Sequence, residues 1–186
     1  NASGAGVLFN VFAGSVNSSL STGAGNVTIT GIGGNNTSST FGFLILGNTT
    51  APALDAGIST TTGNVTITAT AGGGNNDGLR VSSRASIASS GGGAIQLSAT
   101  GSGTNVSAFN MNPASGATST VSSTGGAITI SADTMNLNGN LGTESITTGS
   151  ATSGTVTLKP LSTGKTVALG SGVTDSTTQL AIDSST

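Results

Sequence analysis

The hexapeptides Gly25-Asn-Val-Thr-Ile-Thr30 and Gly63-Asn-Val-Thr-Ile-Thr68 are identical, although they lie far apart in a chain of 186 residues. In both, two aliphatic residues alternate with polar residues, which is typical of a β-strand with one buried and one solvent-exposed face. Repetition of one strand motif indicates a fold built from repeated units. Three related copies follow: Gly93-Ala-Ile-Gln-Leu-Ser98, Gly126-Ala-Ile-Thr-Ile-Ser131 and Gly154-Thr-Val-Thr-Leu-Lys159.

The alternation predicts which side chains form the core. We expect the aliphatic residues of the five copies to point inward and to stack on one another as a ladder, while the polar residues between them face solvent. The predicted core ladder consists of Val27, Ile29, Val65, Ile67, Ile95, Leu97, Ile128, Ile130, Val156 and Leu158.

Two further apolar segments accompany each copy, so that one unit carries three short strands separated by turns rich in Gly, Asn and Ser. The segment before each copy is marked by Leu20, Ile58, Ile87, Val121 and Ile146. The segment after each copy is marked by Phe43/Ile45, Leu79/Val81, either Val106/Ala108 or Phe109/Met111, Met135/Leu137, and Val167/Leu169.

These features predict an all-β fold, a right-handed parallel β-helix (β-solenoid) of about six coils with three short strands each. We expect a single solenoid segment over 1–186, with an irregular first coil over 1–19, repeat units over 20–170 and a last partial coil over 171–186. The alternative is a β-sandwich or an antiparallel meander, which also has short strands and regular turns. Sandwiches rarely repeat one hexapeptide, which favours the solenoid.

The composition excludes several classes of partner. Charged residues make up 5% of the chain, the net charge is −2, and there are four Lys and Arg in total. So few cations cannot neutralise many phosphates, so we expect no nucleic acid partner. The longest apolar run, Phe43–Leu46, is far shorter than a membrane span, so we expect no membrane insertion. There is no Cys or His, and we expect no cofactor.

The segments Ile-Ser-Thr-Thr-Thr-Gly-Asn-Val-Thr-Ile-Thr (58–68) and Val-Ser-Ser-Thr-Gly-Gly-Ala-Ile-Thr-Ile-Ser (121–131) resemble filamentous haemagglutinin-type β-helix repeats. The resemblance covers about residues 20–170. It implies a large secreted bacterial exoprotein, a long extracellular rod at the cell surface, and roles in adhesion, aggregation or biofilm. The family's amino-terminal Asn-Pro-Asn-Gly type turn is missing, which implies an interior stretch or a fibre protein exported another way.

From the resemblance and the composition we expect a structural extracellular rod of a bacterial surface adhesin or filament. Its expected partners are other copies of itself, end to end or side by side, or the continuation of a larger chain, and also glycans or host and cell surfaces. One alternative is a carbohydrate-binding or carbohydrate-active β-helix. Another is an ice-binding solenoid, for which Thr28/Thr30 and Thr66/Thr68 would form a flat outward array.

The sequence offers few residues for chemistry, and we expect no enzyme. The acidic residues are spread along the chain, and only Asp77, Arg80 and Arg84 lie close together in sequence. The segment 72–80, Gly-Gly-Gly-Asn-Asn-Asp-Gly-Leu-Arg, partly matches a calcium-binding nonapeptide repeat. It occurs once, which makes Asp77, Asn75 and Asn76 a weak calcium candidate, and a Gly/Asn-rich turn explains the same residues.

Overall fold

The computed structural model describes residues 4–11, 16–35, 40–48, 55–104, 106–137, 142–149, 154–170 and 173–183. Within these residues all regular secondary structure is β-strand. Nothing in the described part of the chain forms a helix capable of crossing a membrane.

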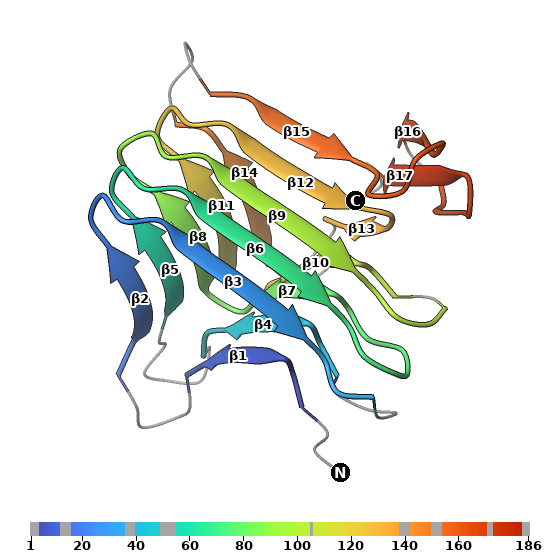
Figure 1. Ribbon diagram of the computed structural model, residues 1–186, viewed down its shortest axis with the longest axis horizontal. Helices are drawn as coiled ribbons and strands as arrows, with labels where there is room; N and C mark the ends of the chain where they lie inside the picture. Colours follow the sequence, from blue (N-terminus) through green and yellow to red (C-terminus); the bar gives the residue numbers. More distant parts are fainter. Residues whose placement is uncertain are drawn as a thin grey trace.

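Fifteen of the strands form three parallel sheets of five strands each (Figure 1). Sheet A contains β1 (Val7–Asn10), β4 (Phe43–Leu46), β7 (Leu79–Ser82), β10 (Phe109–Asn112) and β13 (Met135–Asn136). Sheet B contains β2 (Ser18–Thr22), β5 (Ala56–Thr60), β8 (Ala85–Ser89), β11 (Thr118–Ser123) and β14 (Thr143–Thr147). Sheet C contains β3 (Val27–Ile32), β6 (Val65–Thr70), β9 (Ile95–Thr100), β12 (Ile128–Ala132) and β15 (Val156–Lys159).

The chain passes through sheets A, B and C in turn and then begins the next coil directly on top of the last (Figure 1). The coils wind with a right hand, as parallel crossover connections do in nearly all proteins. Each coil adds about 4.8 Å along the axis, the spacing of hydrogen-bonded strands. The predicted parallel β-solenoid is therefore confirmed, with five stacked coils in the described residues.

Sheet C is built from the repeated hexapeptide. Its first aliphatic column pairs in register from Val27 through Val65, Ile95 and Ile128 to Val156, and its second runs from Ile29 through Ile67, Leu97 and Ile130 to Leu158. The middle members are buried, whereas Ile29 and Leu158 in the end strands are partly buried. Val156, in the edge strand β15, is 41% exposed, whereas Val27, in the opposite edge strand β3, is 5% exposed.

Sheets A and B complete the core around the same axis. In sheet B, Leu20, Ile58, Ile87, Val121 and Ile146 stack in register, as expected for the segment before each copy. In sheet A, Phe43, Leu79, Phe109 and Met135 stack in register. Of the two candidates that the sequence left open, Phe109/Met111 is therefore the strand, and Val106 and Ala108 precede it.

The expectation that Val167/Leu169 forms a further strand of sheet A is wrong. These residues lie in β16 (Thr166–Gly170), which pairs in parallel with β17 (Gln179–Asp183) in a separate two-stranded sheet. Leu169 is 72% exposed, whereas Leu180 of β17 is fully buried and belongs to the core cluster. The edge strand β13 has only two residues, so it offers little ladder for another strand, and Leu180 fills the core there instead.

Glycine residues and hydroxyl-bearing side chains form the corner between sheets B and C. A Cβ atom on Gly63 would lie 2.0 Å from the carbonyl oxygen of Gly25, and one on Gly93 would lie 1.9 Å from that of Gly63. No side chain fits at such a distance, which is why the repeated motif begins with glycine. The hydroxyl of Thr60 closes the turn by donating to the Gly63 carbonyl at 2.6 Å.

Candidate functional site

Asp77 is the central residue of a polar cluster on the outer side of sheet A. It precedes β7 and is 7% exposed. Its Oδ1 accepts a hydrogen bond from the Ser107 backbone N–H at 3.2 Å, and its Oδ2 accepts one from the Asn110 side-chain amide at 2.8 Å. Both donors belong to the next coil, so Asp77 ties two coils together.

Burial raises the pKa of Asp77, because removing water disfavours the charged carboxylate. The hydrogen bond from Asn110, the positive charge of Arg80 and the Ser107 N–H act in the opposite direction but do not cancel this effect. A Nη atom of Arg80 lies 3.9 Å from Asp77 Oδ2. Asp77 is therefore a carboxyl group held in a poorly hydrated position among hydrogen-bond donors.

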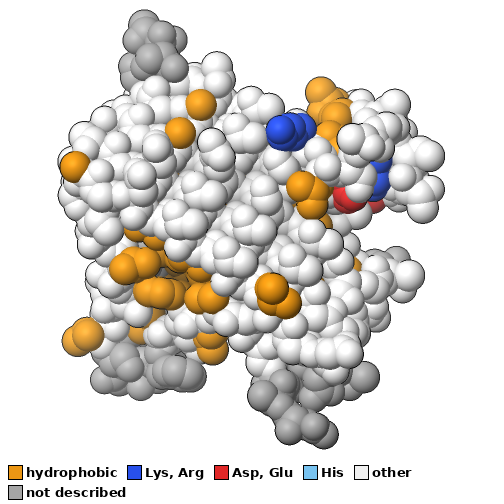
Figure 2. All heavy atoms as spheres, in the orientation of Figure 1, with side chains coloured by type: hydrophobic (Ala, Val, Ile, Leu, Met, Phe, Trp, Pro, Cys, Tyr) orange, Lys and Arg blue, Asp and Glu red, His pale blue; other side chains and the backbone are white. Residues whose placement is uncertain are grey.

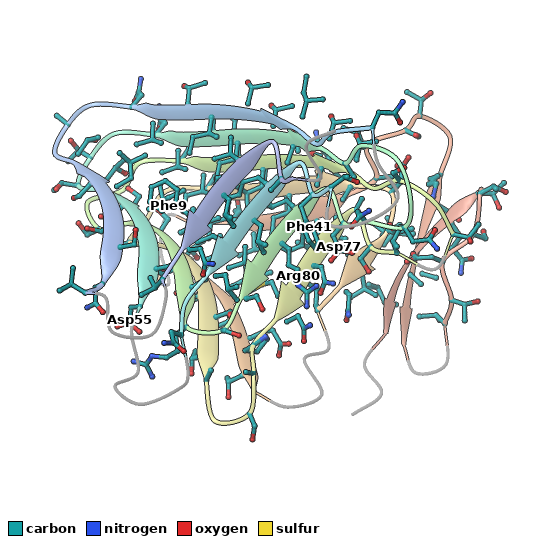
Figure 3. The ribbon with its side chains drawn as sticks, turned by 90° about the horizontal axis from the view of Figure 1, so that it is seen from below. Phe9, Phe41, Asp55, Asp77 and Arg80 are labelled. Atoms are coloured by element: carbon teal, nitrogen blue, oxygen red, sulfur yellow. The ribbon has the colours of Figure 1, made fainter. Side chains whose placement is uncertain are left out.

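A hollow of about 310 Å³ opens beside this cluster. Its wall includes Asp77, Arg80, Asn110, Asn112 and Phe41, and the Arg80 guanidinium lies 5.7 Å from the centre of the Phe41 ring. At this distance the guanidinium charge is attracted to the face of the aromatic ring. Figure 3 shows Phe41, Asp77 and Arg80 gathered on the same side of the solenoid.

The three residues of the weak calcium candidate do not converge on one point, because each is hydrogen-bonded to different partners. Asn75 Oδ1 accepts from the Thr104 N–H, and the Asn76 amide donates to Thr40 Oγ1 and to the Gly73 carbonyl. Asp77 is engaged by Ser107 and Asn110 as described above. No group of three or more His, Cys, Asp or Glu side chains suited to a metal ion occurs in the described part of the chain.

Arg84 is separated from Asp77 and Arg80, despite their closeness in sequence. Its Nε donates to Asp55 Oδ1 at 2.7 Å, across one coil of sheet B. Arg84 and Ser83 both have positive φ angles, 62° and 49°, so the chain turns sharply between β7 and β8 and sends the two arginines to different faces. Figure 3 places Asp55 well away from the group of Asp77 and Arg80.

Asp133 joins the last coil to the C-terminal part of the chain. Its Oδ1 accepts from the backbone N–H groups of Leu161 and Ser162 at 3.0 and 2.7 Å, and the Ser162 hydroxyl donates to Oδ2. Slight burial acts to raise the pKa of Asp133, but the Ser162 hydrogen bonds, the charge of Lys165 and the Leu161 N–H outweigh it, so the pKa is lowered. The charged carboxylate is therefore stabilised here.

Asp175 plays the corresponding role for β17. It accepts a 2.7 Å hydrogen bond from the Ala181 N–H, and burial raises its pKa against the effects of that bond, of Lys165 and of the Met135 N–H. Lys165 donates to the carbonyl groups of Asp133 and Ser176 at 3.0 and 2.8 Å. These contacts connect the β16–β17 unit to the end of the stack.

The outer face of sheet C is mainly polar and uncharged (Figure 2). Thr28 pairs with Thr66 and Thr30 with Thr68, so the threonine array expected from the sequence is regular over two coils. The third coil places Gln96 in the first column, and the fifth coil places Lys159 in the second. Charged side chains on this view gather towards the C-terminal unit (Figure 2).

Asn110, Ser107 and Phe41 are the members of the Asp77 cluster that inspection of the sequence missed. They are brought together by stacking of coils, which carries no local motif. The register of sheet A was the available signal: because Leu79 pairs with Phe109, Asp77 must lie near Ser107 and Arg80 opposite Asn110.

Comparisons with known proteins add no relative. No family model, no curated protein and no solved structure matches the chain. The class that the fold defines is the parallel β-solenoid.

Proposed function

We propose that this chain is a stiff rod segment of a secreted bacterial adhesin or surface filament. The proposal rests on the few charged residues, because acidic side chains among them form hydrogen bonds between coils. Asp55, Asp77 and Asp133 each accept a hydrogen bond from a residue 29 to 33 positions further along the chain, in an adjoining coil or segment. Acidic groups placed in this way hold neighbouring coils together.

The apolar interior supports the same role. In-register columns of apolar side chains fill all three sheets of the stack, and the backbone ladders run along the axis. In such a quasi-one-dimensional array, stability is close to a sum of coil and nearest-neighbour contributions. The same unit can therefore be extended to any length without redesign, which suits a spacer that holds a contact surface away from a cell.

The first coil supports assembly with further coils. Phe9, Leu20 and Ile29 pack against the core but are only partly buried, whereas Ile45, Ile58 and Ile67, their partners in the second coil, are fully buried. Another coil placed against β1, β2 and β3 would cover these side chains and pair the strand edges. We infer that the partner on this side is a coil of the same kind, from another copy or from adjoining sequence.

The proposal is tested on cells that produce the full-length protein. Antibodies raised against the purified chain, coupled to gold particles, are applied to unpermeabilised cells and viewed by electron microscopy. We expect label along thin fibres outside the cell, abolished when the antibodies are first absorbed with the purified chain. Label found only after permeabilisation would overturn an extracellular role.

A further inference from the structure

The hollow beside Asp77 is lined by hydrogen-bond donors and acceptors that lie close to one another. Arg80 supplies guanidinium N–H donors and its side chain is 29% exposed. Asn112 lines the same hollow and makes no side-chain hydrogen bond within the described residues, so its amide offers both a donor and an acceptor. The Phe41 ring adds an apolar surface at the edge.

Asn110 is a second and independent indication. It is 9% exposed, its amide nitrogen donates to Asp77, and its Oδ1 has no hydrogen-bond partner among the described residues. Buried polar atoms are nearly always satisfied, and leaving one without a partner costs about 1–3 kcal/mol. An acceptor left in this state within the wall of a hollow points to a donor supplied from outside the chain.

The charges at the hollow argue against an ion as that ligand. A metal ion would need oxygen atoms that converge on one point, but the Asp77 oxygens already face N–H groups and the Arg80 guanidinium. A strong anion would be repelled by the Asp77 carboxylate on the same wall. A neutral molecule rich in hydroxyl groups matches both features, because each hydroxyl donates and accepts.

We propose that the hollow lined by Phe41, Asp77, Arg80, Asn110 and Asn112 binds one unit of a neutral saccharide. Its hydroxyl groups donate to Asn110 Oδ1 and accept from Arg80 and Asn112, while its C–H face lies against Phe41. The volume of about 310 Å³ is at the lower end of the usual range for small-molecule sites, which fits a single sugar ring. The inference deepens the adhesive part of the proposed function and rests on it.

The test uses the full chain, fluorescently labelled, on an array of neutral and N-acetylated glycans, followed by calorimetric titration of the best ligand. The two arginines of the chain provide matched variants, since Arg80 lies at the hollow and Arg84 pairs with Asp55 elsewhere. We expect Arg80→Gln to weaken binding at least tenfold and Arg84→Gln to leave the affinity within a factor of two.

A second variant, Asn112→Ala, keeps the test valid if Arg80→Gln unfolds the protein. Within the described residues Asn112 accepts a hydrogen bond from Ser82 through its backbone carbonyl, which the substitution keeps, and its side chain makes none. We expect at least threefold weaker binding with an unchanged melting temperature. Failure to bind any glycan on the array, or binding indifferent to both Arg80→Gln and Asn112→Ala, would overturn the site. So would saturable binding of CaCl₂ alone at Asp77. Each of these results would leave the rod proposal standing, since that depends on fibre labelling.

Discussion

The side-chain oxygen of Asn26 accepts a 2.8 Å hydrogen bond from the backbone N–H of Asn64, its equivalent in the next coil. Asn64 repeats the contact one coil further, where its oxygen accepts from the Ala94 N–H at 2.8 Å. The asparagine of the repeated hexapeptide thus extends the backbone ladder around the corner at which each strand of sheet C begins. Its role is to fasten one coil to the next.

We predict that Asn64→Ala lowers the free energy of unfolding by about 0.5–1.5 kcal/mol, because the Ala94 N–H loses its acceptor at a site that water can reach. Urea unfolding followed by circular dichroism measures the loss. The control is Gln96→Ala, an exposed residue of the neighbouring strand, for which we expect a change within about 0.5 kcal/mol. Equal effects of the two substitutions would contradict the fastening role.

The glycine corner gives a sharper contrast. We predict that Gly63→Ala costs about 3 kcal/mol or more, because the new methyl group meets the Gly25 carbonyl oxygen, a backbone atom that cannot move away. Gly25→Ala is the matched control in the identical hexapeptide. Its nearest atoms belong to Thr22, at 3.6 and 3.7 Å, so we expect it to be neutral or stabilising by up to about 1 kcal/mol. Thermal unfolding of both variants distinguishes a steric effect of stacking from a general need for glycine.

The orientation of the strands is tested by two neighbouring residues of β6. Ile67 is fully buried, and Ile67→Asp would place an unpaired charge in the aliphatic column, at a cost of about 3–5 kcal/mol or more. Thr66 points outward, so we expect Thr66→Asp to change the unfolding free energy by less than about 1 kcal/mol. Comparable melting temperatures for the two variants would contradict the proposed burial pattern.

Asp77 and Asp133 should respond to pH with opposite signs. The pKa of Asp77 is raised in the folded protein, so between the unfolded value of 3.8 and the folded value the unfolded chain holds fewer protons, and stability falls as pH rises. The pKa of Asp133 is lowered, so its contribution is present above 3.8 and is lost as pH falls through the folded value.

We therefore expect wild type to lose stability relative to Asp77→Asn as pH rises above 3.8, and to lose stability relative to Asp133→Asn as pH falls below 3.8. Urea unfolding at several pH values measures both differences. Parallel curves for the two variants would show that the surroundings of the two carboxyl groups are not as described.

Much of the fold could be predicted because the hexapeptide repeats and alternates. The buried positions of Val65 and Ile67 follow from period two, and the stack follows from the identity with the copy at Gly25. The fate of Leu169 could not be predicted, because a Val-x-Leu pattern fits an edge strand of any sheet. No local sequence pattern could have predicted the Asp77 cluster, because Ser107 and Asn110 lie next to Asp77 only through the register of adjoining coils.

The unequal size of the coils has a mechanical consequence. Partners in the first two pairings of sheet C, Val27 with Val65 and Val65 with Ile95, are 38 and 30 residues apart. If the rod is pulled from its ends, the force acts on the contacts between adjacent coils, and each coil that unfolds adds a length of chain set by its own number of residues. A single molecule under tension would then extend in steps of unequal length, and the length of each step would identify the coil that unfolded.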